Sequence, residues 1–314
     1  MTVKEVFDLR KQGKIEEAYE AIRPMYAVHQ GKYTTLCMFW TASDVLKKRL
    51  GEKRIAEATG IFEALLRLLP RIGDADGKAH AAILHGVIRL SEAAPAFSML
   101  DFVERFGVDH LTEEDWRVSV VPLPPDGGGG TRMLPCRALR LLTRCFHEVR
   151  QHPDADHALR VMPLLQEAAR RQPYGKNVQR YMAVVYGIMG EREKAAGIYR
   201  QMIRRHHDSY LYAELAELTD DDGMKEALYC RAIQYQRQEK FCATYHLALA
   251  RLLLGRDNAR AAYELQKCIA VRKTLGFGVT REMFQMVNQL QGAEPPSEAE
   301  QQEFYRRMVL RYAL

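Results

Sequence analysis

The sequence has few cysteines and no long run of apolar residues. Among its 314 residues, no stretch approaches the about 20 apolar residues that a membrane-spanning helix needs. The opening residues, MTVKEVFDLRKQGK, mix acids with bases, so we expect no signal peptide. The six cysteines form no CxxC pair, and most lie in apolar helical stretches, where a free cysteine behaves as a small hydrophobe. These absences predict a reduced, cytoplasmic protein.

An excess of one charge is also nearly missing. Lysine and arginine together number 46 against 40 for aspartate and glutamate, which leaves a net charge of +6. This mild excess permits an acidic partner without requiring one. Hydrophobic residues make up 47% of the chain, enough to bury a substantial core or the continuous spine of a repeat array.

Motifs for catalysis or for cofactor binding are absent as well. The run of four glycines that begins at Gly127 is not a phosphate-binding loop, because Arg132 stands five residues on and no lysine follows. Cys242 and His246 are four residues apart and would face one metal ion from a helix, but no third ligand stands nearby, which favours packing. No G-x-S-x-G or H-E-x-x-H motif occurs. We therefore expect neither an enzyme nor a bound cofactor or metal.

What the sequence does contain is a recurring helical pattern. In AVVYGIMGEREKAAGIYRQMI, an apolar helical pattern stops at Gly190, a residue type that readily takes the positive φ that ends a helix. Acids then open a second pattern in which Ala195, Tyr199 and Met202 share one face. The small alanine allows a paired helix to approach closely. The stretch predicts two antiparallel helices around a tight turn.

The same pattern returns along the chain. Ala195, Ala227 and Ala261 follow one another at steps of 32 and 34 residues, and GEKRIAEATGIFEALLRLLP carries Ala58 and Phe62 before a proline. This series resembles the tetratricopeptide repeat family, whose helix–turn–helix unit has a 34-residue period and an A-x3-F…P signature. The resemblance covers 34–70 and 176–273 best. It implies an all-α fold of antiparallel helix pairs stacked into an α-solenoid, a tetratricopeptide-like superhelix.

One segment interrupts the array. VPLPPDGGGGTRMLP, residues 121–135, has four prolines and four glycines and predicts an exposed loop. We expect it to divide an N-terminal helical array, 1–120, from a C-terminal array, 136–314, that ends in a capping helix after Ser297.

Shorter signals mark individual helices. Pro24 and Pro163 lie inside otherwise helical patterns and should kink or split them. Asp154 or Asp156 predicts a helix N-cap between two histidines.

The resemblance also implies a binding surface. The first helix of each tetratricopeptide unit lines the concave face, so its exposed residues are expected to meet the ligand. In this sequence these residues are Asn177, Arg180, Val184, Tyr212, Tyr245 and Leu249. Only Asn177 and Arg180 suit the two-carboxylate clamp that some members use. The tyrosines fit peptide recognition, but the same spacing also fits a packed core between repeats.

A second candidate surface lies on the helix predicted in CRALRLLTRCFHEVR. Arg137, Arg140, Arg144 and His147 fall within about 80° of one another around the helix, opposite its apolar side. Such a face would suit phosphates or an acidic peptide. The alternative is a solvated face whose charge is balanced by acids on neighbouring helices.

Three functional hypotheses follow. The leading one is a cytoplasmic, non-enzymatic scaffold or adaptor that binds a protein or peptide along the concave face. The alternative is a nucleic-acid-associated repeat protein that uses the arginine-rich face. The third, an enzyme with a site assembled on the 121–135 loop, predicts a deep polar pocket beneath that loop.

Overall fold

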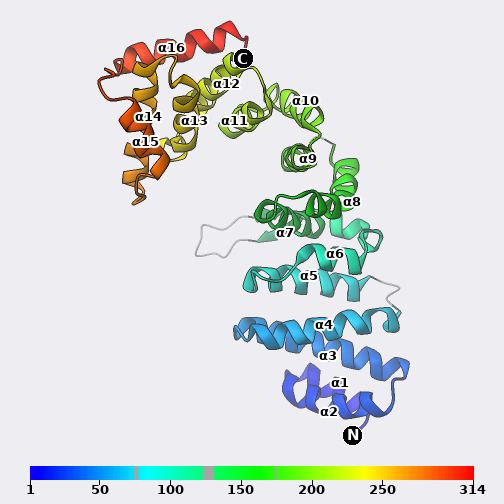
Figure 1. The fold of residues 1–314 in the computed structure, drawn as a ribbon. Coiled ribbons are helices and arrows are strands. Elements are labelled where there is room, and N and C mark those ends of the chain that lie inside the picture. Colours follow the sequence, from blue (N-terminus) through cyan, green and yellow to red (C-terminus); the bar gives the residue numbers. More distant parts are fainter. Residues whose placement is uncertain (74–76, 123–130, 174) are drawn as a thin grey trace. The chain divides into compact units, whose positions relative to one another are not determined.

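The chain is built from helices that follow one another in pairs (Figure 1). The computed structural model describes residues 1–73, 77–122, 131–173 and 175–314. Within these ranges the secondary structure is helical apart from one two-stranded hairpin. The residues form two compact units, Met1–Gln172 and Pro173–Leu314. The predicted all-α fold of stacked helix pairs is confirmed.

The first unit contains eight α-helices in its described residues. They are α1 (Val3–Lys11), α2 (Ile15–Val28), α3 (Lys32–Gly51), α4 (Ile55–Ile72), α5 (Lys78–Ala93), α6 (Met99–Phe106), α7 (Arg137–Gln151) and α8 (Ala155–Arg171). Short 3₁₀ helices, Val108–His110 and Glu113–Trp116, follow α6. Strands β1 (Ser119–Pro122) and β2 (Thr131–Leu134) precede α7.

The second unit continues the series. Its helices are α9 (Lys176–Ile188), α10 (Arg192–Ile203), α11 (Ser209–Leu218), α12 (Asp222–Tyr235), α13 (Ala243–Leu253), α14 (Asn258–Thr274), α15 (Arg281–Gln289) and α16 (Glu298–Arg311). A 3₁₀ turn, Glu239–Phe241, precedes α13. Connections of a few residues between α9 and α10 or α13 and α14 place the members of each pair side by side and antiparallel.

The turns and seams of the second unit follow the sequence pattern. Gly190 has φ +80°, a conformation that costs a residue with a side chain about 1–2 kcal/mol, so glycine is the natural residue between α9 and α10. Ala195, Ala227 and Ala261 are all fully buried where neighbouring helices meet. A larger side chain at these points would hold the helices apart. The burial of the spaced alanines agrees with their predicted place between paired helices.

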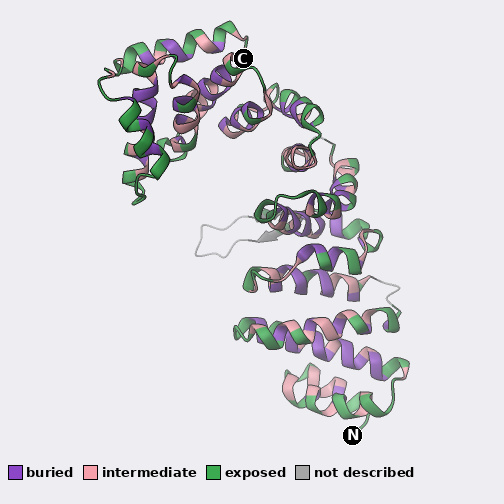
Figure 2. Cartoon of the chain, viewed as in Figure 1, coloured by how far each residue is buried: buried purple, intermediate pink, exposed green. Residues whose placement is uncertain are grey.

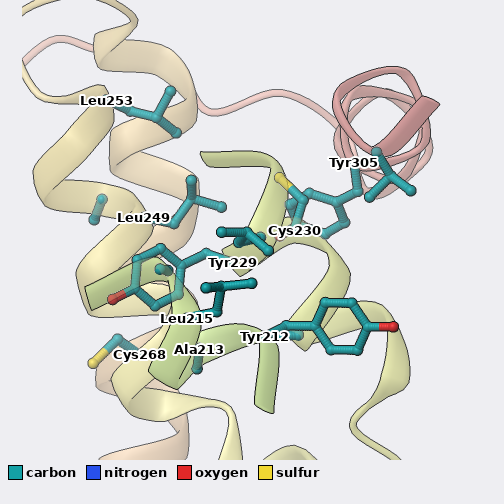
Figure 3. Packing of buried hydrophobic residues seen from close by; sticks show 14 of the residues in the cluster. Tyr212, Ala213, Leu215, Tyr229, Cys230, Leu249, Leu253, Cys268 and Tyr305 are labelled. Atoms are coloured by element: carbon teal, nitrogen blue, oxygen red, sulfur yellow. The ribbon is translucent and has the colours of Figure 1, made fainter. Parts of the chain in front are cut away.

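Apolar side chains on the facing sides of the helices make the core of the second unit (Figure 2). Figure 3 shows Leu215 of α11 lying near Tyr229 of α12 and Leu249 of α13. Burying a leucine side chain stabilises a fold by roughly 1.5–3 kcal/mol, so each such contact between successive helices contributes to the stability of the stack.

A buried carboxylate attaches the last helix. Glu264 of α14 is fully buried and accepts hydrogen bonds from Gln301 and Tyr305 of α16, the first at 2.5 Å. The Nδ1 atom of His246 in α13 lies 2.6 Å from the other oxygen of Glu264. Because a buried charge is costly unless it is hydrogen-bonded, this network ties α16 to α14 in one position.

Two local predictions about helix starts are confirmed, and the predicted splitting of two helices at prolines is corrected. Asp154 caps α8 by accepting from the His157 amide, and Ser297 forms a capping box with Glu300 at the start of α16. The prolines, by contrast, do not split their helices, since α2 and α8 each run continuously through Pro24 and Pro163.

The proline- and glycine-rich segment differs from the expectation at its ends. β1 and β2 pair antiparallel, with Val120 opposite Met133, so a hairpin stem stands where only a loop was predicted. Residues 123–130 lie outside the described residues, and with them the centre of the predicted loop and of the hypothetical active site.

The compact units do not divide at 121–135. Helix α7 packs against α5 and α6 of the first unit. The Glu148 carboxylate of α7 accepts hydrogen bonds from the Met99 and Leu100 amides at the start of α6, at 2.7 and 3.2 Å. A carboxylate at the positive end of a helix is favourable, and these contacts hold α7 within the first unit.

Candidate partner-binding faces

The predicted groove residues of the second unit divide into exposed and buried sets. Asn177 is exposed, and Arg180, Val184 and Tyr245 are half-buried. Tyr212 is 3% exposed and Leu249 is fully buried.

The assignment of Tyr212 and Leu249 to a groove was wrong, because both side chains belong to the packed core between helices. The Tyr212 ring lies against Tyr235 of α12, with 5.4 Å between the ring centroids.

The accessible stripe of α11 instead carries Tyr210, Glu214 and Glu217, at i, i+4 and i+7. Arg180 of α9 donates to Glu214 at 2.5 and 3.0 Å and lies over the Tyr210 ring, 4.5 Å from its centroid. The Tyr199 hydroxyl donates to the same carboxylate at 2.9 Å. Arg180 is thus already paired within the unit, and a ligand carboxylate would have to compete with Glu214.

Lys176 repeats this arrangement one turn earlier. Its ammonium lies 2.9 Å from the Asp208 carboxylate and 5.9 Å from the centroid of the Tyr210 ring. The hydrogen bond that Lys176 donates to the Asp208 carboxylate raises the pKa of Lys176. Burial raises the pKa of Tyr245 on the neighbouring first helix. The face formed by α9, α11 and α13 is therefore electrically balanced and rich in tyrosine, a residue that contributes large contact area in protein recognition.

The predicted basic face of α7 is likewise paired with acids. Arg137 donates to Asp115 at 2.6 Å, and Asp115 is almost fully buried in the 3₁₀ helix after α6. Arg144 and Arg140 share Glu92 of α5, at 2.7 and 3.7 Å. His147, the fourth predicted residue, is exposed. The interpretation in which neighbouring acids balance this face fits the three arginines.

A hollow between α3 and α5 has several basic side chains at its rim. It has a volume of about 360 Å³, its floor is apolar, and Lys47, Lys78, His85 and Arg89 stand around it. Gly86 allows the two helices to approach, since a Cβ atom there would lie 3.0 Å from Leu46 Cδ2. We call this site the α3–α5 hollow.

Positive charges at and near the α3–α5 hollow act on His85. Burial lowers the pKa of His85 below its ordinary value, and the charges of Arg140 and Arg89 lower it further. Lys47 pairs with Asp44 at 3.2 Å, whereas Arg89 has no ion-pair partner among the described residues. An anionic group in the hollow would relieve this repulsion, so the geometry suits a carboxylate beside an apolar side chain.

The candidate metal ligands are occupied by structural contacts. His246 is held by Glu264, and Cys242 is buried, as are all six cysteines, which are free. Oxygen and nitrogen atoms of Asp154, Asp156 and His157 come within 4.8 Å of one another at the start of α8. Asp154 already accepts from the amide and ring of His157 at 3.0 and 2.9 Å, so helix capping accounts for this group.

A family model described as a domain of unknown function, DUF7017, matches residues 178–311, within the second unit. None of the curated proteins matches the chain.

Two solved structures are similar to this chain over most of its length. A tetratricopeptide repeat protein from Parabacteroides merdae is 10% identical, with a TM-score of 0.38, and the match covers 92% of this chain and 97% of that one. BtubC (BKLC) from P. vanneervenii is 12% identical, with a TM-score of 0.28, and the match covers 92% and 94%.

None of the helices in the described part of the chain is both long and apolar enough to cross a bilayer. This result agrees with the lack of long apolar runs in the sequence.

Proposed function

We propose that the protein is a non-enzymatic adaptor that binds an extended, acidic segment of a partner protein on the first-helix faces of its helix pairs. The observation that carries the proposal is the α3–α5 hollow, where Arg89 and its neighbouring cations surround an apolar floor. A peptide with alternating acidic and apolar side chains would place carboxylates at the rim and aliphatic groups on Leu46 and Leu50.

The balanced face of the second unit is the second proposed contact. Asn177, Val184 and Tyr245 are accessible there, and Tyr210 stands between two cations that already have partners. Such a face favours aromatic and hydrogen-bonding contacts over capture of a free carboxylate. This face would bind its segment independently of the α3–α5 hollow and does not require that segment to be acidic.

A peptide fits the hollow better than a nucleic acid does. Of the described residues that line it, only His85 carries an aromatic ring, so it lacks the stacking surfaces on which single-stranded bases usually lie. The nearby arginines of α7 are paired with Glu92 and Asp115, which reduces the number of cations left for phosphates.

The test uses a labelled synthetic peptide of about 12 residues that alternates glutamate and leucine, which extends over the length of such a face. Arg89→Glu should weaken its binding at least about tenfold, because an attraction becomes a repulsion at the rim. Arg67→Glu is the matched control, since Arg67 is exposed on α4 and has no ion pair among the described residues.

Fluorescence anisotropy at two salt concentrations measures both variants and the wild type. Equal affinities of the wild type and Arg89→Glu would refute the proposed site. Stronger binding of a single-stranded RNA than of the peptide, with a steep loss on adding salt, would replace the adaptor by the nucleic-acid alternative.

A further inference from the structure

Five large apolar side chains lie exposed at the turn from α14 to α15 and on α15 itself. They fall within 13 consecutive positions, and the outermost of them, Phe284, is 62% exposed. We call them the α15 patch: Leu275, Phe277, Val279, Phe284 and Val287. Single exposed apolar residues are common, but five within one short segment favour an interaction site.

The apolar stripe of α15 is wider than the part of it that packs against the core of the unit. Met283 and Met286 are buried against the core of the unit. At 3.6 residues per turn, Val287 lies about 40° and Phe284 about 100° from Met283 around the helix axis. Both continue the same apolar surface past the edge of the packed region, so one side of the stripe is covered and the other is open.

The position of α15 in the stack explains the open side. It follows α13 as the next first helix, and Arg251 of α13 donates to Glu282 of α15 at 2.6 and 2.7 Å. Helix α16 does not take the place of its second helix, because it packs mainly against α12 and is held by Glu264 of α14. Helical-repeat arrays normally end in a polar face. Helix α15 instead leaves part of an apolar surface exposed, and such a surface suits contact with a further helix.

The charges around the patch indicate the chemistry of that helix. From Arg272 to Gln291 the sequence has three cations and one acid, Glu282, which Arg251 already binds. Lys273 and Arg281 are exposed and have no ion-pair partner among the described residues. A second copy of this chain would bring like charges together, whereas a helix with acidic residues beside its apolar stripe would neutralise them.

We propose that the α15 patch binds an amphipathic helix with acidic flanks, supplied by a partner protein. The helix lays its apolar side on Phe284 and Phe277, and its carboxylates meet Lys273 and Arg281. This is the helix-in-groove mode of recognition, with the partner helix extending the stack beyond α15. The site is separate from the α3–α5 hollow and involves a different unit of the chain.

The probe is a fluorescein-labelled helical peptide of about 18 residues, with leucine on one face and glutamate elsewhere, long enough to form stable turns on binding. The full chain should bind it, and Phe277→Ser/Phe284→Ser should weaken binding at least about tenfold. Phe241→Ser/Leu310→Ser is the matched control, because both residues are exposed in the same unit, at 54% and 78%, outside the patch. Circular dichroism verifies that each variant is folded.

Charge is tested separately from apolar contact. A peptide with lysine in place of every glutamate should bind at least about tenfold more weakly, and Lys273→Glu/Arg281→Glu should reverse that preference. Arg89→Glu should leave binding of this probe unchanged, which separates the site from the α3–α5 hollow.

Five outcomes would overturn the proposal, four of them in experiments on the protein and the peptides alone. These four are no binding of the glutamate peptide, equal binding of the lysine peptide, an equal loss in the control variant, and association of the chain with itself that disappears in Phe277→Ser/Phe284→Ser. Patch-dependent binding to vesicles of phosphatidylserine and phosphatidylcholine would point to a membrane surface and would also overturn it.

Discussion

Replacing Tyr305 by phenylalanine should weaken the attachment of α16 while leaving the volume of the core almost unchanged. The Tyr305 side chain is 1% exposed, and its hydroxyl donates to the fully buried carboxylate of Glu264. Burial, and then the Glu264 charge, raise the pKa of Tyr305 far above its ordinary value, so the hydroxyl keeps its proton at any accessible pH. A hydrogen bond to a charged group contributes about 1.5–3 kcal/mol, and we expect a loss of about 2 kcal/mol in the free energy of unfolding.

The positions of the tryptophans allow a loss of stability to be assigned to one unit or the other. The chain's two tryptophans, Trp40 and Trp116, both lie in the first unit, so their fluorescence follows that unit alone. Far-ultraviolet circular dichroism follows the helices of both units. In urea, Tyr305→Phe should shift the circular dichroism transition that belongs to the second unit and leave the tryptophan transition in place.

Tyr263→Phe provides the matched control. The Tyr263 hydroxyl also donates to a glutamate, Glu298, but that side chain is 59% exposed and water can replace the lost partner. This change should cost about 0.5 kcal/mol or less. If the two variants lose equal stability, or if the tryptophan transition moves with Tyr305→Phe, the buried network is not what holds α16.

Three further predictions address other parts of the molecule. Arg49 and then Lys48 lower the pKa of Glu16 to about 2. The stability that Glu16 gives to the first unit should therefore be complete above about pH 4.5 and decline as the pH falls towards 2. Urea titrations followed by tryptophan fluorescence should show this decline, and the decline should be smaller in Glu16→Gln. The pKa of His85 should be higher in Arg89→Gln than in the wild type, and it should also rise when the acidic peptide binds. NMR titration of the imidazole measures both changes. An unchanged pKa in Arg89→Gln would mean that the Arg89 charge does not act on His85. Gly190→Ala should destabilise the second unit by about 1 kcal/mol, because residue 190 has a positive φ. Gly197→Ala, inside α10, should stabilise the unit by about 0.5–1 kcal/mol. If thermal unfolding gave changes of the same sign for both variants, the backbone argument would be wrong.

The helix pairs could be predicted because their signals are local. Gly190 ends one helix, and Ala195 is buried where the next helix packs against it. Both residues stand within a few positions of the turn that they determine. The hairpin stem at Ser119–Pro122 was missed for the converse reason. Its strands are four residues long and flank a proline- and glycine-rich stretch, so no alternating pattern is long enough to identify them.

The candidate faces were harder to predict, because helical periodicity fails where a helix is buried on most sides. In α11, Leu211, Tyr212 and Leu215 are all buried, so apolar character does not distinguish the outer face from the inner one. The usable signal is the polar pair Glu214 and Glu217, which marks the accessible stripe and places Tyr210, four residues before Glu214, on it.

Charge on a repeat surface is decided between helices rather than along one of them. Glu92 lies 52 positions before Arg144 and still pairs with it, while Arg89, on the same helix as Glu92, has no partner in the described residues. A count of arginines along α7 therefore overstates its positive potential, and a similar count along α5 would understate it. The same rule makes Arg89 the informative residue. Removing an arginine that already has an acidic partner would free a carboxylate and change the local structure. Reversing the charge at Arg89 leaves no carboxylate without its partner and changes the charge that His85 and an incoming anion meet.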